Sequence, residues 1–221
     1  MIFSSSKNGL TVEGNPIESF RSDAKGSKYL YLIAGIHGDE VEGIFLLQKL
    51  FAWLSENHNM EDLPMIVVPI LNIDGHYRLS KYNANGVDLN TNFPTNIHSS
   101  IPRKQTFLSE LESSFIDQQF KKYPPGIVFN FMSQYPKITY SGNARDVVNY
   151  LSKLNSYPTK EEQVLDRGTI CHYGDYHYKT PVINFYTSRI NEDLKLNDIW
   201  EHNKYCFKRL FLSEILNRHL F

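Results

Sequence analysis

Apolar residues along this chain form two patterns that predict an alternation of strands and helices. Four nearly continuous apolar runs predict strands covered on both faces, at 28–34, 64–71, 127–131 and 181–185. Helical spacing of apolar residues predicts helices at 39–57 and 106–122, and further helical regions are expected at 143–154 and 194–219. The polar stretch 72–102, rich in Asn and Gly, predicts mostly loop. Strands that alternate with helices indicate a layered α/β fold.

The end of the first apolar run carries the most informative polar residues. Residues 32–40 read L-I-A-G-I-H-G-D-E, so His37 and Glu40 follow a glycine turn at the carboxyl end of a buried strand. An imidazole and a carboxylate in this place are unusual unless they bind something, and zinc takes both as ligands. The sequence therefore predicts a metal-binding pair at His37 and Glu40. A carboxylate that only stabilises the start of the following helix is the alternative for Glu40.

Composition narrows the class of protein. The chain has 221 residues, 41% of them hydrophobic, which is consistent with a single domain over 1–221. Its net charge of -1 gives no electrostatic reason to expect nucleic acid or an anionic membrane as partner. No apolar run approaches the length of a membrane span, and residues 1–9 show no apolar signal segment. Two cysteines make no disulfide framework, so we expect a cytoplasmic protein.

Five separated segments match one family pattern in order. They are V-E-G-N-P-I at 12–17, G-I-H-G-D-E at 35–40, N-I-D-G at 72–75, N-A-N-G-V-D-L-N-T-N-F-P at 83–94, and a weaker match from 168 to 183. The chain thereby resembles the zinc carboxypeptidase family, in particular its small bacterial branch of murein-peptide amidases and γ-glutamyl-diaminopimelate peptidases. The run at 83–94 is the most specific of the five.

The resemblance implies a fold, a cofactor and a ligand. The implied fold is a three-layer α/β/α sandwich with a mixed, mostly parallel twisted sheet of about eight strands. The implied zinc is held by His, Glu and a second His, and a glutamate takes a proton from the metal-bound water. An arginine polarises the scissile carbonyl, and an Asn-Arg pair holds the terminal carboxylate of a peptide or murein peptide.

The chain departs from this pattern at the positions that carry the chemistry. Met132 aligns with the second ligand His, and a thioether is a poor ligand for Zn²⁺. Tyr186 aligns with the catalytic glutamate, and a phenol of ordinary pKa near 10 is a poor base. Asn90 and Thr91 stand where the family has its Asn-Arg pair, and Lys81 stands at the polarising arginine. With two ligands left, we expect zinc to be weakly bound or absent.

Three functional hypotheses follow from these departures. The first is a metallocarboxypeptidase fold with lost or strongly impaired peptidase activity that still binds peptides or cell-wall fragments, with Tyr173 at the position of the family's loop tyrosine. The second is an active zinc hydrolase in which His172 or His177 replaces the missing ligand, although loop residues without a metal role are the simpler interpretation of both. The third is an aspartoacylase-like deacylase, which shares the His-x-x-Glu opening. The sequence does not indicate an oligomeric state.

Overall fold

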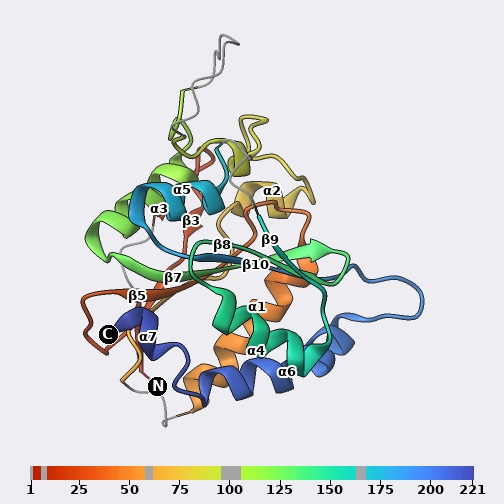
Figure 1. Cartoon of the computed structure of the whole chain (residues 1–221). Coiled ribbons are helices and arrows are strands. Elements are labelled where there is room, and N and C mark those ends of the chain that lie inside the picture. Colours follow the sequence, from red (N-terminus) through yellow and green to blue (C-terminus); the bar gives the residue numbers. More distant parts are fainter. Residues whose placement is uncertain (1, 6–8, 58–61, 96–105, 163–167) are drawn as a thin grey trace.

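A single mixed sheet forms the centre of the molecule (Figure 1). The computed structural model describes residues 2–5, 9–57, 62–95, 106–162 and 168–221. In these residues the sheet has eight strands in the order β1-β4-β6-β5-β7-β10-β8-β9. Their bounds are β1 Phe3–Ser5, β4 Phe20–Ser22, β5 Tyr29–Ala34, β6 Met65–Val68, β7 Pro125–Gln134, β8 Lys137–Ser141, β9 Thr159–Glu161 and β10 Val182–Ser188. A separate pair, β2 Gly9–Leu10 and β3 Pro16–Ile17, makes a small hairpin.

The four central strands run parallel, which brings their carboxyl ends to one edge. β5 pairs in parallel with β6 and β7, and β7 pairs in parallel with β10. β4 and β8 join this centre in antiparallel fashion. Ligands of open α/β sheets bind at the carboxyl ends of central strands, so this edge is where a site is expected.

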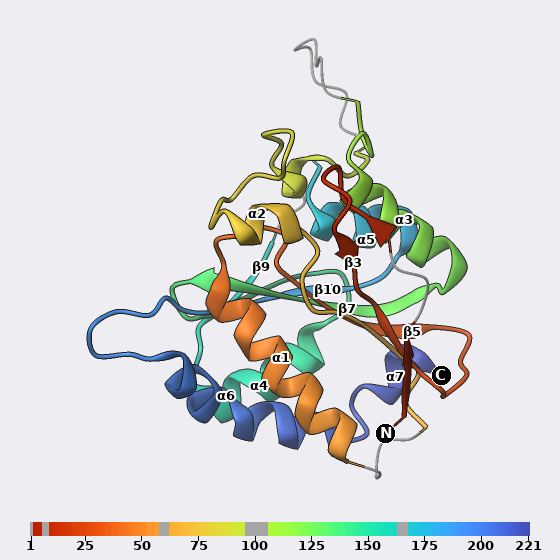
Figure 2. The ribbon, with the colours of Figure 1, turned by 180° about the vertical axis from the view of Figure 1, so that it is seen from behind.

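Helices cover both faces of the sheet (Figures 1 and 2). Their bounds are α1 Val41–Glu56, α2 Ile73–Tyr77, η2 Leu89–Thr91, α3 Leu111–Lys122, α4 Arg145–Asn155, α5 Ile170–Tyr178, α6 Leu196–Phe211 and α7 Asn217–Leu220. Apolar residues of α1, α4, α6 and α7 pack with one face of the sheet, and those of α3 and α5 pack with the other. We call the face under α3 and α5 the site face. The predicted three-layer sandwich with a mixed, mostly parallel sheet is confirmed.

Alternate side chains of β7 and β10 point to opposite faces of the sheet. Phe129 and Phe131 of β7 belong to the core beneath α1 and α6, whereas Val128 belongs to the core beneath α3 and α5. Successive side chains of a strand point to opposite faces. Asn130 and Met132 therefore lie on the site face.

The predicted core strands and helices are present. Several predicted boundaries were wrong, and two short helices were not predicted. The predicted strand 127–131 extends over Pro125–Gln134, and the predicted helix 106–122 begins only at Leu111. The predicted helical region 194–219 is divided into α6 and α7. The stretch 72–102, expected to be mostly loop, contains α2 and η2, and its residues 96–102 lie outside the described part of the chain.

The segment expected as the last loop of the family pattern is instead the helix α5. The Thr169 hydroxyl accepts a hydrogen bond from the backbone N–H of His172, which caps the helix start. Lys179 ends it in the left-handed region with φ of 53°. His172 and His177, expected as loop residues, are therefore helical. In the described ranges no helix is long and apolar enough to cross a bilayer.

Candidate functional site

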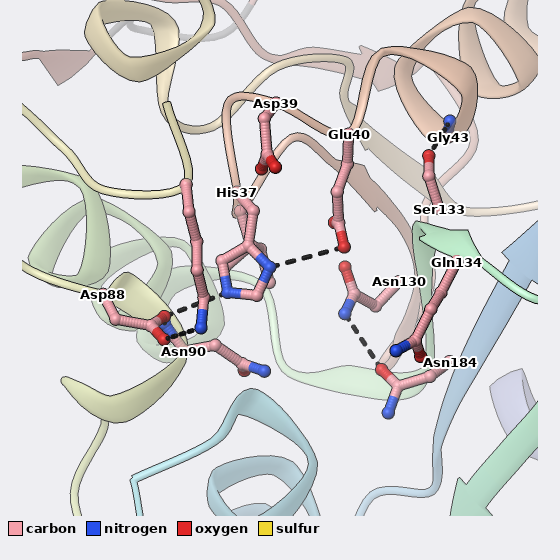
Figure 3. Close-up of polar contacts among 12 residues, drawn as sticks. His37, Asp39, Glu40, Gly43, Asp88, Asn90, Asn130, Ser133, Gln134 and Asn184 are labelled. Carbon is pink, nitrogen blue, oxygen red and sulfur yellow. Dashed lines mark hydrogen bonds and ion pairs between the residues drawn. The ribbon is translucent and has the colours of Figure 1, made fainter. Parts of the chain in front are cut away.

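His37 and Glu40 lie at the carboxyl end of β5, beside the first turn of α1. Gly35 takes a φ of 65°, a left-handed conformation that turns the chain out of the strand. Glu40 is the residue before α1, and the two side chains face each other with Nδ1 of His37 3.3 Å from Oε1 of Glu40 (Figure 3). Both residues are buried, with 9% and 5% exposure. The sequence-predicted pair is thus together, at the edge of the sheet where a site is expected.

Close approaches of backbone hold this loop in place. A Cβ on Gly38 would lie 2.1 Å from the carbonyl carbon of Gly75, and one on Gly43 would lie 2.8 Å from the carbonyl oxygen of Phe131. Only glycine fits at such distances, so the H-G-D-E loop packs directly on α2 and α1 directly on β7. Two of the motif segments are therefore in contact through their glycines.

Asp88 completes a row of charged side chains around His37. Its Oδ1 faces the His37 ring (Figure 3), 2.9 Å from Nε2. Its Oδ2 is 2.8 Å from Nζ of Lys81. A carboxylate on one ring nitrogen fixes the other nitrogen as the one that faces a metal. Asp88 therefore orients Nδ1 of His37 toward Glu40. Our sequence interpretation missed this role, although Asp88 lies inside the best-matching motif.

Burial and the neighbouring charged groups shift the pKa values of His37, Glu40 and Asp88. Burial lowers the pKa of His37, but hydrogen bonds to Asp88 and Glu40 outweigh it and raise that pKa to about 9. Burial raises the pKa of Asp88, but His37 and Lys81 outweigh it and lower that pKa to about 2. Burial raises the pKa of Glu40. In the metal-free protein at neutral pH, the pair of His37 and Asp88 is an imidazolium and a carboxylate.

Replacing Asp88 by Asn is expected to destabilise the protein in a pH-dependent way. A pKa lowered from 3.8 to about 2 corresponds to roughly 2 kcal/mol of stability, present above pH 3.8 and lost as the pH falls to 2. The raised pKa of His37 gives stability that is complete below pH 6.5 and lost as the pH rises through 9. The difference between the original protein and Asp88→Asn should therefore be largest between about pH 4 and pH 6.5.

Chemical denaturation at several pH values measures this difference. The control is Glu161→Gln, which removes the carboxylate of an exposed ion pair with Arg145 and should give no comparable loss. Equal stability of the original protein and Asp88→Asn at pH 5 would contradict the assignment of this ion pair.

Met132 and Tyr186 lie side by side on neighbouring strands. Their Cα atoms are partners in the parallel register of β7 and β10, and both side chains alternate onto the site face. Met132 is 4% exposed. The Tyr186 ring has Nζ of Lys137 4.4 Å from its centre. Burial, followed by the charges of Glu162, Cys171 and Glu40, raises the pKa of the Tyr186 phenol.

Asn90 and Thr91 lie in η2, and both side chains make hydrogen bonds within the protein. The Thr91 hydroxyl donates to the carbonyl oxygen of Asp88 at 2.8 Å. The side-chain oxygen of Asn90 accepts from the backbone N–H of Ile170 at 3.2 Å, at the start of α5. Thr91 brings no positive charge to the place where the family has an arginine.

The aromatic and histidine candidates of α5 have neighbours other than His37. Tyr173 is 3% exposed, packs on Phe93 and Phe120, and donates its hydroxyl proton to Asp117. His172 is buried, with Nε2 3.2 Å from the Thr95 hydroxyl. His177 is exposed. Tyr173 would have to leave the core to touch a ligand.

His37 and Glu40 are of the residue types that serve as protein ligands of a catalytic zinc, which needs three of them. Across the described ranges, no group of three His, Cys, Asp or Glu side chains is placed to hold a metal ion. His37 and Glu40 face each other, with 3.3 Å between Nδ1 and Oε1, and the motif alignment puts Met132 at the position of the third ligand. These residues therefore do not form the complete ligand set of a catalytic zinc.

Two amides and a carboxylate on the site face were not predicted. Asn130 and Asn184 are buried on β7 and β10, and Nδ2 of Asn130 donates to Oδ1 of Asn184 at 2.9 Å (Figure 3). Glu162, which follows β9, has its Oε1 3.4 Å from Nδ2 of Asn184. No motif marks these residues, because they meet only through the order of strands β7, β10 and β8.

Sequence comparisons find similarity to known proteins over parts of the chain. Residues 27–124 match the family described as the succinylglutamate desuccinylase/aspartoacylase catalytic domain. A stretch of 70 residues is 39% identical to carboxypeptidase SOL1 of Arabidopsis thaliana. That match covers 28% of this chain and only 14% of the plant protein.

Solved structures share the fold over nearly the whole chain. The murein-tripeptide amidase of Escherichia coli O157 has a TM-score of 0.74 at 20% identity, covering 95% of this chain and 92% of that one. The carboxypeptidase A of Helicoverpa armigera has a TM-score of 0.77 at 16% identity, covering 96% and 68%. These structures share the fold that the motifs predicted, and with the partial sequence matches they bear out the resemblance to zinc carboxypeptidase-like proteins.

Proposed function

We propose that this zinc carboxypeptidase-like protein binds peptides at the edge of the sheet where the central strands end, and that its hydrolytic activity is lost or strongly impaired. The observation that carries the proposal is the pairing of Met132 with Tyr186 on neighbouring strands. These positions match the second ligand and the base of the family. A thioether and a phenol replace an imidazole and a carboxylate there.

The surroundings of Tyr186 oppose any role as a base. Its pKa is raised by burial and by nearby carboxylates, so the phenolate needed to accept a proton is strongly disfavoured at neutral pH. A neutral phenol can donate a hydrogen bond to a bound peptide carbonyl. We therefore assign Tyr186 to ligand binding rather than to proton transfer.

Lys81 is the charged group that we assign to the ligand's carboxylate. Its side chain is 46% exposed while its Nζ contacts Asp88, so a ligand can reach it. Asp88 already neutralises this ammonium, and Thr91 offers no guanidinium. A peptide or murein peptide would thus be held more weakly than by the family's arginines. Asn90 next to Thr91 is the further polar group that we assign to the ligand.

The proposal is tested with purified protein, saturating zinc and a panel of C-terminal and γ-glutamyl peptides. We expect calorimetry to detect binding and mass spectrometry to detect no released amino acid. Lys81→Met should weaken binding about two- to fivefold, the size of a half-exposed ion pair. Hydrolysis by the original protein that disappears in His37→Ala would contradict the proposal.

A deacylase is the second candidate, because the desuccinylase/aspartoacylase family matches residues 27–124. That chemistry also needs the second His and the Glu that Met132 and Tyr186 replace, so the same impairment is expected. Adding N-succinylglutamate and an N-acyl aspartate to the panel separates the two. Deacylation without peptide binding would favour the second candidate.

An active hydrolase with a relocated ligand makes a different prediction. It requires stoichiometric zinc that is lost in His172→Ala or His177→Ala. Metal analysis by mass spectrometry decides between it and the peptide-binding proposal. We expect neither substitution to change the bound metal, because His172 and His177 form no three-ligand group with His37 and Glu40 in the part of the chain that the structure covers.

A further inference from the structure

A chain of hydrogen bonds crosses the site face from Glu162 to Asn130. Nδ2 of Asn184 lies 3.4 Å from Oε1 of Glu162, and Nδ2 of Asn130 lies 2.9 Å from Oδ1 of Asn184. Nδ2 of Asn184 also has Sγ of Cys171 at 3.0 Å and the Thr139 hydroxyl at 3.3 Å. The two asparagines are Cα partners on β7 and β10, so strand register sets this contact.

The Glu162 carboxylate at one end of this hydrogen-bond network fixes which atoms donate and which accept. An ionised carboxylate only accepts hydrogen bonds, so Asn184 turns its amide nitrogen toward Glu162 and its oxygen toward Asn130. Asn130 must then donate to that oxygen. Turning the Asn130 amide over would place two carbonyl oxygens against each other. The carbonyl oxygen of Asn130 is therefore the atom that points away from the network.

That oxygen is buried without a partner. Asn130 is fully buried, and its Oδ1 has no hydrogen-bond partner among the described residues. Oε2 of Glu40, whose residue is 5% exposed, is likewise unpartnered there. Figure 3 shows the Asn130 oxygen pointing to the Glu40 carboxylate, on the side away from Asn184. Two buried acceptors that face one another call for a cation or a donor between them.

We propose that Oδ1 of Asn130 joins His37 and Glu40 as the third protein donor of a divalent-cation site. The donor set is one imidazole nitrogen, one carboxylate and one amide oxygen, and Met132 is a bystander. Imidazole suits zinc, while carboxylate and amide oxygens suit manganese, so the set fits either ion. The site would position a ligand rather than cleave it, because no carboxylate base stands at Tyr186. This inference does not depend on peptide binding.

A proton instead of a metal ion would also satisfy the Glu40 and Asn130 oxygens. A proton held by the Glu40 carboxyl can be donated to the Asn130 carbonyl, and no metal would then be needed. The same residues would be buried in the same way. Only the response to added metal separates the two arrangements.

Calorimetric titration of the metal-free full chain with ZnCl₂ and with MnCl₂, without peptide, tests the inference. We expect one ion per chain, and Asn130→Ala should weaken its binding at least about tenfold. Met132→Leu, a matched change two residues along the same face, should bind within about threefold of the original. Electron paramagnetic resonance of bound Mn²⁺ should change in Asn130→Ala and remain the same in Met132→Leu.

Asn130→Asp is the second variant and keeps the test decisive if Asn130→Ala does not fold. A carboxylate in place of the amide should tighten ion binding at least about tenfold and make thermal stability rise with added metal. In a chelator the same variant should be less stable than the original protein, because its buried charge is then unpaired. No ion bound to the original protein at millimolar concentration would overturn the inference. Unchanged binding in Asn130→Asp, or a loss in Met132→Leu, would also overturn it.

Discussion

Restoring three family residues, by Met132→His, Tyr186→Glu and Thr91→Arg together, is expected to produce zinc-dependent peptide hydrolysis at least about 100-fold above that of the original protein. The histidine completes a three-ligand zinc site with His37 and Glu40. The glutamate supplies a base on the neighbouring strand, because residues 132 and 186 are Cα partners. The arginine supplies the fork that holds a terminal carboxylate.

The measurement is the rate of amino-acid release from a C-terminal peptide with and without zinc. A control variant, Met132→Leu, Tyr186→Phe and Thr91→Ser, changes the same positions without adding ligand, base or charge, and should show no release. Zinc binding alone should already tighten at least about 100-fold in Met132→His, since a direct ligand is added to a retained pair. A hydrolytic rate of the original protein equal to that of the restored variant would contradict the assigned losses.

Replacing Phe131 by Ala is expected to lower the free energy of unfolding by about 3–5 kcal/mol. This side chain is fully buried, and its ring centre lies 5.4 Å from that of Phe207 and 6.2 Å from that of Phe185. Its removal would leave a cavity beneath β7 on the face opposite the site. Because Phe131 lies between Asn130 and Met132 in the chain, the loss should also loosen the strand that positions both.

Urea denaturation measures the change, with Tyr135→Ala as the matched control. Tyr135 directly follows the same strand but is 78% exposed, so its truncation should change stability by no more than about 0.5 kcal/mol. A loss below about 1 kcal/mol in Phe131→Ala would show that the core beneath β7 is not packed as described.

The central elements could be predicted from the sequence because local pattern and burial agree in them. β5, β6 and the middle of β7 and β10 are buried on both faces, and a strand of this kind reads as a continuous apolar run. α1 shows a clear helical period for the same reason. Edge strands gave no such signal. β9 is fully exposed, and β1 is exposed or half-buried, so neither needs apolar residues.

α5 was missed because its residues are largely polar. Its sequence I-C-H-Y-G-D-Y-H-Y has a glycine in the middle and few aliphatic residues, which reads as loop. The helix is stabilised by tertiary contacts instead. Tyr173 packs on Phe93 and Phe120, two rings that are distant in the sequence. Such contacts are not visible in a local pattern.

The site was predictable in part. Contacts between residues close in the sequence could be predicted, and contacts between distant segments could not. His37 and Glu40 are three residues apart, so their proximity follows from the turn alone. Asp88 lies in a recognisable run, but its contact with His37 depends on how η2 folds back onto β5. The pairing of Asn130 with Asn184 depends on strand order. The cytoplasmic location and the single domain stay predictions from composition.

Crystals of the original protein soaked with zinc, measured by anomalous diffraction at the zinc absorption edge, test most directly whether a hydrolytic centre has been lost. We predict a peak contacted by His37 and Glu40, with the Asn130 oxygen as the third protein donor and the Tyr186 phenol in place of a base. A zinc ion held by a third protein nitrogen, with a carboxylate beside its open position, would contradict the loss of catalysis proposed for this chain.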